Sequence, residues 1–363
     1  MSRITIRRLE ARGVLVPMRR APVTGSGGID GAPLVLVDLH TDAGITGRAY
    51  LFAFTRTMLA PTVATLAALD DLVVEHDAAP LALDASLRRR LTLQDTHGAL
   101  GQALAAIDMA AWDAHAQVAG MPLARLLGAA TARVPAYNSC GLWVGDPARL
   151  GDEAEALVDE GGYSAVKLRL GRPGFAGDLA AVRAVRGRLP DTLRVMSDFN
   201  QALDAHEALA RCRALDDEGL YWFEEPVRHD DWRSAARIRA AVRTPVQLGE
   251  NLRGPSEMDL AVAAGAADLY MPDVQRIGGV SGWLRAASLA ALHDLPLSSH
   301  LFPEFSVHLL AASPTAHYLE FMDWAAPILQ QPLLVRDGHA EVPDRPGAGL
   351  AWDEAAVSRY RVC

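Results

Sequence analysis

The segment from Arg194 to Asn200 reads RVMSDFN, and the fold is decided there. Two apolar residues, Val195 and Met196, lead almost directly to Asp198, which is the pattern of a buried strand that ends on a carboxylate. Because side chains alternate along a strand, the pattern predicts that Asp198 and Asn200 share one face. We therefore expect an acid and an amide to point together from one strand end.

The same pattern returns twice downstream at a regular interval. YWFEEP ends with Glu224 and Glu225, and VQLGEN ends with Glu250. Asp198 and Glu224 are 26 residues apart, and so are Glu224 and Glu250. This length suits one strand, one helix and two short loops, so the acids are expected at matching ends of consecutive parallel strands.

Three carboxylates that converge on one point predict a site for a hard cation. No cysteine or histidine accompanies them, which favours Mg²⁺, with Mn²⁺ as an alternative, over zinc. A simpler interpretation is that each acid caps the helix after its strand, and for any single acid that interpretation is preferable. Equal spacing of three acids favours a metal site formed by Asp198, Glu250 and one of Glu224 and Glu225.

Length and composition limit the possible classes of protein. At 363 residues the chain exceeds the usual size of one hydrophobic core, so one large and one smaller domain are expected. Half of the residues are apolar and 22% are charged, as in an ordinary globular enzyme. The net charge of −9 argues against nucleic acid or an anionic membrane as a partner, because both require a basic face.

The cysteines and the first residues bear on the cellular compartment. Cys140, Cys212 and Cys363 lie far apart and suggest neither a disulfide framework nor a zinc motif. The start, MSRITIRRLEARG, lacks the apolar core of a signal peptide, and no run of about 18 uninterrupted apolar residues occurs. We therefore expect a cytoplasmic, reduced protein.

The first third of the chain has the pattern of an α+β domain. Residues 3–18 and 33–50 alternate apolar and polar side chains, and the turn TDAG at 41–44 predicts an antiparallel hairpin. The glycine-rich stretch 21–31 predicts a loop that is either a connector or a lid. From residue 55 to about 128 the sequence is helical and rich in alanine, so residues 1–128 are expected to form one domain.

Strands and helices then alternate, which predicts a parallel (β/α)₇β barrel, resembling a TIM barrel, over residues 129–322. Amphipathic helical segments fill the gaps between the strands. The last residues, 323–363, lack a clear eighth helix and are expected to fold back onto the first domain. The predicted strands are 134–140, 165–170, 194–200, 221–226, 246–251, 269–274, 295–300 and 316–321.

Other predicted strands also end in polar side chains, and the chemistry of a parallel barrel collects at those ends. The second strand offers Lys167 and Arg169 on one face, and the eighth offers Glu320. The sixth and seventh would bring Asp273 beside His300, a pairing that orients a general base. A lone histidine such as His300 is more often structural. Here, however, a metal ion, the cationic side chains of Lys167 and Arg169, and an Asp-His pair together suit an enzyme that removes a proton from the carbon next to a carboxylate.

These residues and the segments around them closely resemble the enolase superfamily, specifically its mandelate racemase group. The similarity spans the whole chain, and the order and spacing of the motifs make chance agreement implausible. The segments that carry it include PLVLVDLHTDAGITGRAYLFAF, AAIDMAAWDAHAQVAGMPLARLLGA, AVKLRLG, SDFNQALD, WFEEP, VQLGENLRGP, MPDVQRIGGVSGW, SSHLFPEFSVHLLAASPTAHYLE and VPDRPGAGLAW.

The resemblance implies a role for each matched residue and selects Glu224 over Glu225. It also implies that residues 22–29 form a loop that closes over a small-molecule carboxylate substrate, and that the protein is a homo-oligomer, plausibly an octamer. The implied roles are Mg²⁺ ligands for Asp198, Glu224 and Glu250, a substrate-carboxylate contact for Lys167, the dyad base for Asp273 and His300, an electrophilic acid for Glu320 and an enolate neighbour for Asn200.

One position departs from the family pattern. The second lysine of the family's KxK motif, the base on the face opposite the histidine, is Arg169 here. A neutral arginine at pH 7 costs roughly 7 kcal/mol, although Mg²⁺ and Lys167 nearby would reduce that cost. Arg169 therefore weakens the prediction of a racemase with two bases and favours a dehydratase in which His300 acts alone.

The predicted substrate pocket favours the opposite conclusion. The resemblance places Phe52 and Leu301, together with Leu51, Phe54 and Phe302, around the substrate side chain, which suits an apolar or aryl group. We therefore expect an Mg²⁺-dependent racemase of a 2-hydroxycarboxylic acid similar to mandelate, with an acid-sugar dehydratase as the alternative. A barrel that only binds a metal and a ligand is a third possibility, but it would have no need for a poised base.

Overall fold

A three-stranded antiparallel sheet opens the chain, in the order β1 (Ile6–Pro17), β4 (Gly31–Thr41), β5 (Thr46–Phe52). The structure is a computed structural model, and it describes residues 4–24 and 27–363. The predicted hairpin is confirmed, because β4 pairs with β5 across the turn near Gly44, which has the positive φ that a tight turn requires. Two short strands, β2 (Val23–Thr24) and β3 (Gly27–Gly28), lie between β1 and β4.

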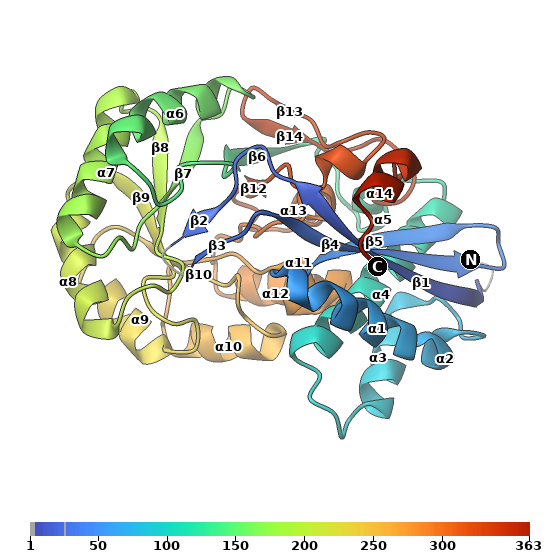
Figure 1. Cartoon of the computed structure of the whole chain (residues 1–363). Helices are drawn as coiled ribbons and strands as arrows, with labels where there is room; N and C mark the ends of the chain where they lie inside the picture. Colours follow the sequence, from blue (N-terminus) through green and yellow to red (C-terminus); the bar gives the residue numbers. More distant parts are fainter. Residues whose placement is uncertain (1–3, 25–26) are drawn as a thin grey trace.

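Helices cover this sheet and complete the α+β part of the chain (Figure 1). The long helix α4 (Gly98–Val118) packs on β4 and β5 through its small residues. A Cβ atom at Gly47 would lie 2.0 Å from the Ala110 carbonyl oxygen, so the close approach requires glycine. The other elements are η1 (Arg56–Met58), α1 (Leu59–Ala68), α2 (Asp70–Val73), α3 (Pro80–Arg90) and α5 (Leu123–Leu126).

The second part of the chain is a closed, mostly parallel barrel, as predicted. From β6 to β11 each strand pairs with the next in sequence, isolated bridges through Leu297 connect β11 to the segment before β12, and β12 pairs with β6. In Figure 1 the helices form an outer arc around these strands. The strands are β6 (Arg133–Asn138), β7 (Ala165–Arg169), β8 (Arg194–Asp198), β9 (Leu220–Glu224), β10 (Val246–Leu248), β11 (Leu269–Tyr270) and β12 (Leu319–Phe321).

In the described part of the chain eight helices lie between the first and last barrel strands, and one of them, α11, is a single turn. Their buried residues recur at helical spacing, which places one apolar stripe of each long helix against the strands. The helices are α6 (Pro147–Asp159), α7 (Phe175–Arg188), α8 (Ala205–Leu215), α9 (Trp232–Arg239), α10 (Pro255–Ala263), α11 (Val274–Ile277), α12 (Gly279–Leu292) and α13 (Pro303–Ala311).

The C-terminal segment contacts both parts of the chain. After η2 (Ala326–Ile328), the hairpin of β13 (Val335–Arg336) and β14 (His339–Glu341) pairs with barrel strand β6. Helix α14 (Glu354–Tyr360) then packs on β1. The boundaries at 128/129 and 322/323 stay predictions.

Several strands are shorter than the sequence predicted. Strand β8 ends at Asp198, and Asn200 has a φ of +45°, so it does not share a strand face with Asp198. The chain turns because the Asp198 carboxylate accepts hydrogen bonds from the backbone N–H of Asn200 at 2.7 Å and from its Nδ2 at 3.0 Å. The predicted strand 295–300 forms only isolated bridges, such as that between His300 and Asp273.

None of the helices in residues 4–24 and 27–363 is both long and apolar enough to cross a membrane. The predictions of a cytoplasmic location and of a homo-oligomer stay predictions.

Candidate active site

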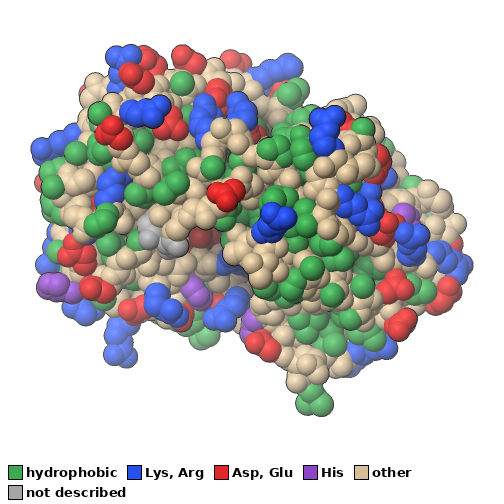
Figure 2. Space-filling model, viewed as in Figure 1, with side chains coloured by type: hydrophobic (Ala, Val, Ile, Leu, Met, Phe, Trp, Pro, Cys, Tyr) green, Lys and Arg blue, Asp and Glu red, His purple; other side chains and the backbone are tan. Residues whose placement is uncertain are grey.

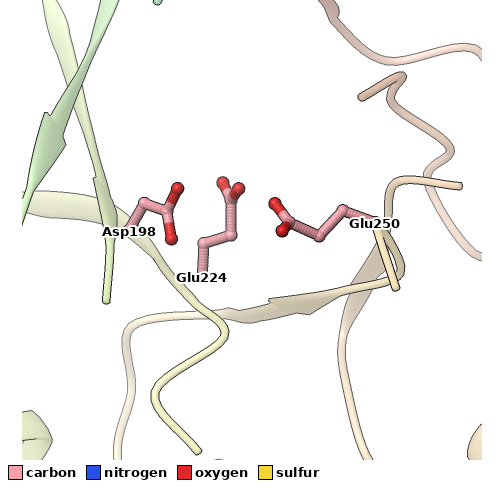
Figure 3. A group of neighbouring side chains, drawn as sticks. All are labelled: Asp198, Glu224 and Glu250. Carbon is pink, nitrogen blue, oxygen red and sulfur yellow. The ribbon is translucent and has the colours of Figure 1, made fainter. Parts of the chain in front are cut away.

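Three carboxylates meet at the ends of consecutive barrel strands, as their spacing predicted. Asp198 ends β8, Glu224 ends β9 and Glu250 follows β10, and each offers an oxygen within 4.8 Å of the others. In Figure 3 the three side chains point toward a common space. All three are buried. Oxygen ligands in this arrangement fit a hard divalent cation such as Mg²⁺.

The electrostatics of the cluster also fit a cation. Burial, followed by repulsion from the Asp198 carboxylate, raises the pKa of Glu224 well above its usual value. Negative charges this close destabilise one another unless a proton or a metal ion lies between them. A divalent cation would therefore let all three carboxylates stay ionised.

The structure separates Glu224 from its neighbour Glu225. Glu224 points into the cluster, whereas Glu225 has a φ of +38° and its Oε2 accepts a hydrogen bond from Asn251 Nδ2 at 2.7 Å. The Asn251 amide also donates to Glu250 Oε1 at 3.0 Å and so orients that ligand. The geometry agrees with the selection of Glu224, and it adds Asn251 as a supporting residue that the sequence did not indicate.

Lys167 from β7 lies among the acids. Its Nζ is 2.7 Å from Glu224 Oε1, 2.7 Å from Glu320 Oε1 and 3.4 Å from Asp198 Oδ2. Burial alone would lower the pKa of Lys167, but the carboxylates of Glu224 and Glu320 raise it well above its usual value. Lys167 is therefore a permanent cation beside the cluster, which suits binding of a substrate carboxylate.

His300 and Asp273 form the predicted pair. The imidazole Nδ1 lies 2.7 Å from Asp273 Oδ2. The other carboxylate oxygen caps α11 by accepting from the backbone N–H groups of Gln275 and Arg276 at 2.8 and 3.2 Å, which fixes Asp273 in place. With Nδ1 protonated, Nε2 carries the lone pair and faces Glu250 Oε2 at 3.4 Å.

The charge on His300 responds to its neighbours. Burial alone would lower the pKa of His300, but Glu250 and the hydrogen bond to Asp273 raise it to about 9. A cation bound by Glu250 would offset part of that rise. The pair thus holds a base of raised proton affinity beside the carboxylate cluster.

Arg169 is held rigidly. Its Nη1 donates to the Ser139 carbonyl oxygen at 3.2 Å, and its Nη2 donates to Ser139 Oγ at 2.8 Å. The guanidinium also stacks 4.3 Å from the centre of the Trp143 ring. Donation of two hydrogen bonds and stacking on an aromatic face both favour the charged guanidinium. Ser139 and Trp143 follow β6, and the sequence analysis did not select them.

Glu320 lies near both Lys167 and His300. Its Oε1 accepts from Ser139 Oγ at 2.7 Å, and its Oε2 accepts from the Leu301 N–H at 2.9 Å. Burial would raise the pKa of Glu320, but Lys167 and His300 lower it below its usual range. Glu320 is therefore a carboxylate in this arrangement, and its role as an acid, which requires a proton, stays a prediction.

A cavity of about 390 Å³ joins these groups to an apolar wall. The Phe52 ring lies 4.7 Å from Phe54 and 4.9 Å from Trp324, centre to centre. Leu301 and Met322 also line the cavity. Phe52 and Leu301 were predicted as substrate contacts, whereas Trp324 and Met322 were not, because only the fold of the last forty residues brings that segment here.

The predicted lid is only partly described. Pro22, Thr24, Gly27, Gly28 and Ile29 line the same cavity, and Asn200 lines it too. Gly25 and Ser26 lie outside the described residues. Closure of this loop over a substrate stays a prediction.

Comparison with protein families agrees with the motifs. The model described as "Mandelate racemase / muconate lactonizing enzyme, N-terminal domain" matches residues 8–128, and "Enolase C-terminal domain-like" matches residues 149–356. Together they span most of the chain. The protein therefore belongs to the mandelate racemase/muconate lactonizing enzyme family of the enolase superfamily, as the sequence predicted.

Curated relatives include lyases and isomerases. The chain is similar to L-talarate/galactarate dehydratase of Salmonella typhimurium, with 36% identity over 70% of this chain and 64% of that protein. It is also similar to 3,6-anhydro-alpha-L-galactonate cycloisomerase of Streptomyces coelicolor, with 31% identity over 91% of each. The chain is an enzyme of this superfamily, and these relatives leave both reaction classes open.

Solved structures are similar over the whole chain. An enolase from Bradyrhizobium, complexed with magnesium and mandelic acid, is 39% identical, with a TM-score of 0.95 and complete coverage of both chains. An enolase from the alpha proteobacterium BAL199 with bound magnesium is 42% identical, with a TM-score of 0.96, over 99% of this chain and 100% of that one. Magnesium in both relatives agrees with the predicted cofactor.

Proposed function

We propose that the protein is an Mg²⁺-dependent racemase of a 2-hydroxycarboxylic acid that carries an apolar or aryl group. The single observation behind this proposal is the lining of the cavity. It divides into charged groups and a cluster of aromatic rings, in which Phe52 contacts Phe54 and Trp324. A substrate with a carboxylate at one end and a ring at the other matches this division.

The charged side supplies the means of removing an α-proton. Mg²⁺ held by Asp198, Glu224 and Glu250 would stabilise the negative charge that develops on the substrate carboxylate. Lys167 adds a fixed positive charge beside two of these metal-ligand carboxylates, Asp198 and Glu224. Together they lower the free energy of the enolate, which is the costly species on this route.

His300 is the base in this proposal. In the neutral ring the Nδ1–H is donated to Asp273, and the lone pair of Nε2 takes the α-proton and later returns it. His300 Nε2 approaches Glu320 Oε2 at 3.9 Å, and Arg169 Nη2 approaches Glu320 Oε1 at 3.8 Å. The imidazole thus lies near one oxygen of the Glu320 carboxylate and the guanidinium near the other. We assign proton exchange on the face of the substrate opposite His300 to Arg169 or to a water molecule that it positions.

The bonds of Arg169 favour a second candidate. Both of its terminal nitrogens donate to Ser139 and the guanidinium stacks on Trp143, which is typical of a fixed cation and not of a base. An acid-sugar dehydratase needs only His300, acting first as the base and then as the acid for the departing β-hydroxyl. The similarity to L-talarate/galactarate dehydratase supports this alternative.

One experiment separates the two candidates. Single enantiomers of mandelate and related aryl 2-hydroxy acids are incubated with the protein and Mg²⁺ in D₂O and followed by NMR and chiral chromatography, in parallel with a library of sugar acids. Deuterated antipode supports the racemase. A 2-keto-3-deoxy product from a sugar acid, with no turnover of the aryl acids, supports the dehydratase, and exchange without inversion contradicts racemisation.

A further inference from the structure

A second cavity, distinct from the proposed active site, is lined with arginine. It has a volume of about 470 Å³ and lies between the barrel and the N-terminal helices. Arg88 comes from α3, Arg253 from the loop before α10, Arg276 from α11 and Arg285 from α12. Residues from both parts of the chain thus bring four guanidinium groups to one hollow.

Among the described residues no carboxylate lines this cavity, so the charged side chains of its wall are all basic. Acids outside the lining pair with three of the arginines. Asp84 lies 2.7 Å from Arg88 and 3.8 Å from Arg285, and Glu257 lies 3.2 Å from Arg253. A third acid, Asp95, accepts a hydrogen bond from the backbone N–H of the lining residue His97 at 2.9 Å and interacts with Arg253. Three acids therefore neighbour the four arginines, and the wall keeps a net positive charge.

The fourth arginine is poorly satisfied. Arg276 Nη1 donates to Asn251 Oδ1, and the guanidinium stacks 4.3 Å from the Phe54 ring. Its Nε is buried and has no hydrogen-bond partner among residues 4–24 and 27–363, and the same is true of Nδ1 of His229, which lines the same cavity. A buried donor without an acceptor costs free energy, which a bound ligand would recover.

Backbone dipoles add to the positive field. Helices α4 and α10 both begin at the cavity wall, at His97 and Gly254. The His97 side chain makes no capping hydrogen bond to the first turn of α4, and Gly254 has no side chain with which to cap α10. Helix N-termini of this kind favour anions, here as a supplement to the four arginines.

We propose that this cavity binds a small molecule that bears a phosphate group. Four segments of the chain each contribute a guanidinium group, and a tetrahedral dianion offers more acceptor oxygens to them than a planar carboxylate does. The volume admits a small molecule, while the overall charge of −9 disfavours a nucleic acid. Figure 2 shows basic and histidine side chains at the notch between the two lobes, with acidic side chains beside them.

The cavity adjoins the active site. Asn251 and Arg276 line both cavities, and Asn251 donates to the predicted metal ligand Glu250. A bound phosphate would therefore lie one side chain away from the metal cluster. The proposal of the site itself does not depend on which reaction the enzyme catalyses.

The test is isothermal titration calorimetry of the full chain with inorganic phosphate, in buffer that contains Mg²⁺ and chloride at constant ionic strength. The double variant R253Q/R285Q removes two half-exposed arginines and leaves Arg88 to pair with the buried Asp84. The matched control R183Q/R188Q removes two exposed arginines of helix α7, which pair with Glu218 and Glu155. Thermal unfolding in chloride verifies that both variants are folded.

We expect saturable binding at one site per chain, at least tenfold weaker in R253Q/R285Q and within twofold of the parent in the control. Equal affinity in all three proteins would place the phosphate elsewhere, for example on Mg²⁺, and would overturn the proposal, as would absence of saturable binding. Tighter binding of succinate than of phosphate would overturn the assignment of the ligand class.

Discussion

The side chain of Gln275 pairs in both directions with the backbone of Phe52. Its Oε1 accepts from the Phe52 N–H at 3.0 Å, and its Nε2 donates to the Phe52 carbonyl oxygen at 3.3 Å. Gln275 lies two residues after Asp273, so the short helix α11, which follows the partner of the base His300, also holds the end of β5, which carries Phe52 of the aromatic wall. The Asp-His pair of the barrel and the Phe52 wall of the N-terminal sheet are thereby held in a fixed position relative to each other.

Loss of this pairing should affect stability and substrate binding together. In Q275A the buried N–H and carbonyl groups of Phe52 lose their partner, so the free energy of unfolding should fall by roughly 1–3 kcal/mol. The KM for an aryl substrate should rise because Phe52 is released. Denaturant unfolding and steady-state kinetics measure both effects. The control Q330A loses a hydrogen bond to the Trp352 carbonyl oxygen, and because neither residue lines the active-site cavity it should leave KM unchanged.

Mg²⁺ affinity should depend on Glu250 and not on Glu225. E250Q removes one anionic ligand from the cluster and should weaken Mg²⁺ binding by about tenfold or more, measured by calorimetry and by the rise in the midpoint of thermal unfolding on adding Mg²⁺. E225Q changes a neighbouring buried carboxylate outside the cluster and should keep one Mg²⁺ per chain. An equal loss in both variants would refute the assignment of Glu224 and Glu250 as the ligands.

Proton exchange should divide between two groups if the racemase proposal is right. H300N removes the base and should slow α-proton exchange of one enantiomer by about 10²–10⁴-fold. R169M should stop inversion while exchange by His300 continues. NMR of each enantiomer in D₂O measures the two rates. Normal inversion by R169M would show that Arg169 has no part in proton exchange.

The stability of the fold should fall in mild acid because of His308, a buried residue of α13. Its Nδ1 accepts from the Ala124 N–H at 3.2 Å and its Nε2 lies 3.2 Å from the Ala348 carbonyl oxygen, so the neutral ring fits both neighbours. Burial lowers the pKa of His308 to about 4, against a usual value of about 6.5.

Between these two pH values the unfolded chain binds a proton that the folded chain does not bind. The contribution of His308 is therefore complete above pH 6.5 and is lost as the pH falls toward 4, by up to about 3 kcal/mol. H308Q keeps an acceptor and a donor but cannot titrate. Its unfolding free energy should vary less over this range in denaturant titrations, and a slope identical to that of the parent would disprove the assignment.

The sequence by itself determined the residues of the reacting centre. Asp198, Glu224 and Glu250 lie at equal spacing, and parallel strands deliver their ends to one edge of a barrel, so local pattern sufficed to bring the acids together. The same reasoning placed Asp273 beside His300, since neighbouring strands end side by side.

The tertiary structure decided how that centre is enclosed and held. Trp324 reaches Phe52, Gln275 holds the end of β5, and Ser139 binds Arg169, each across a long stretch of sequence. The arginine cavity likewise combines Arg88 of the N-terminal helices with Arg253 of the barrel. Periodicity reports only which face of an element is buried. Which side chains meet depends on how whole elements dock, and that is set by packing between residues far apart in the chain.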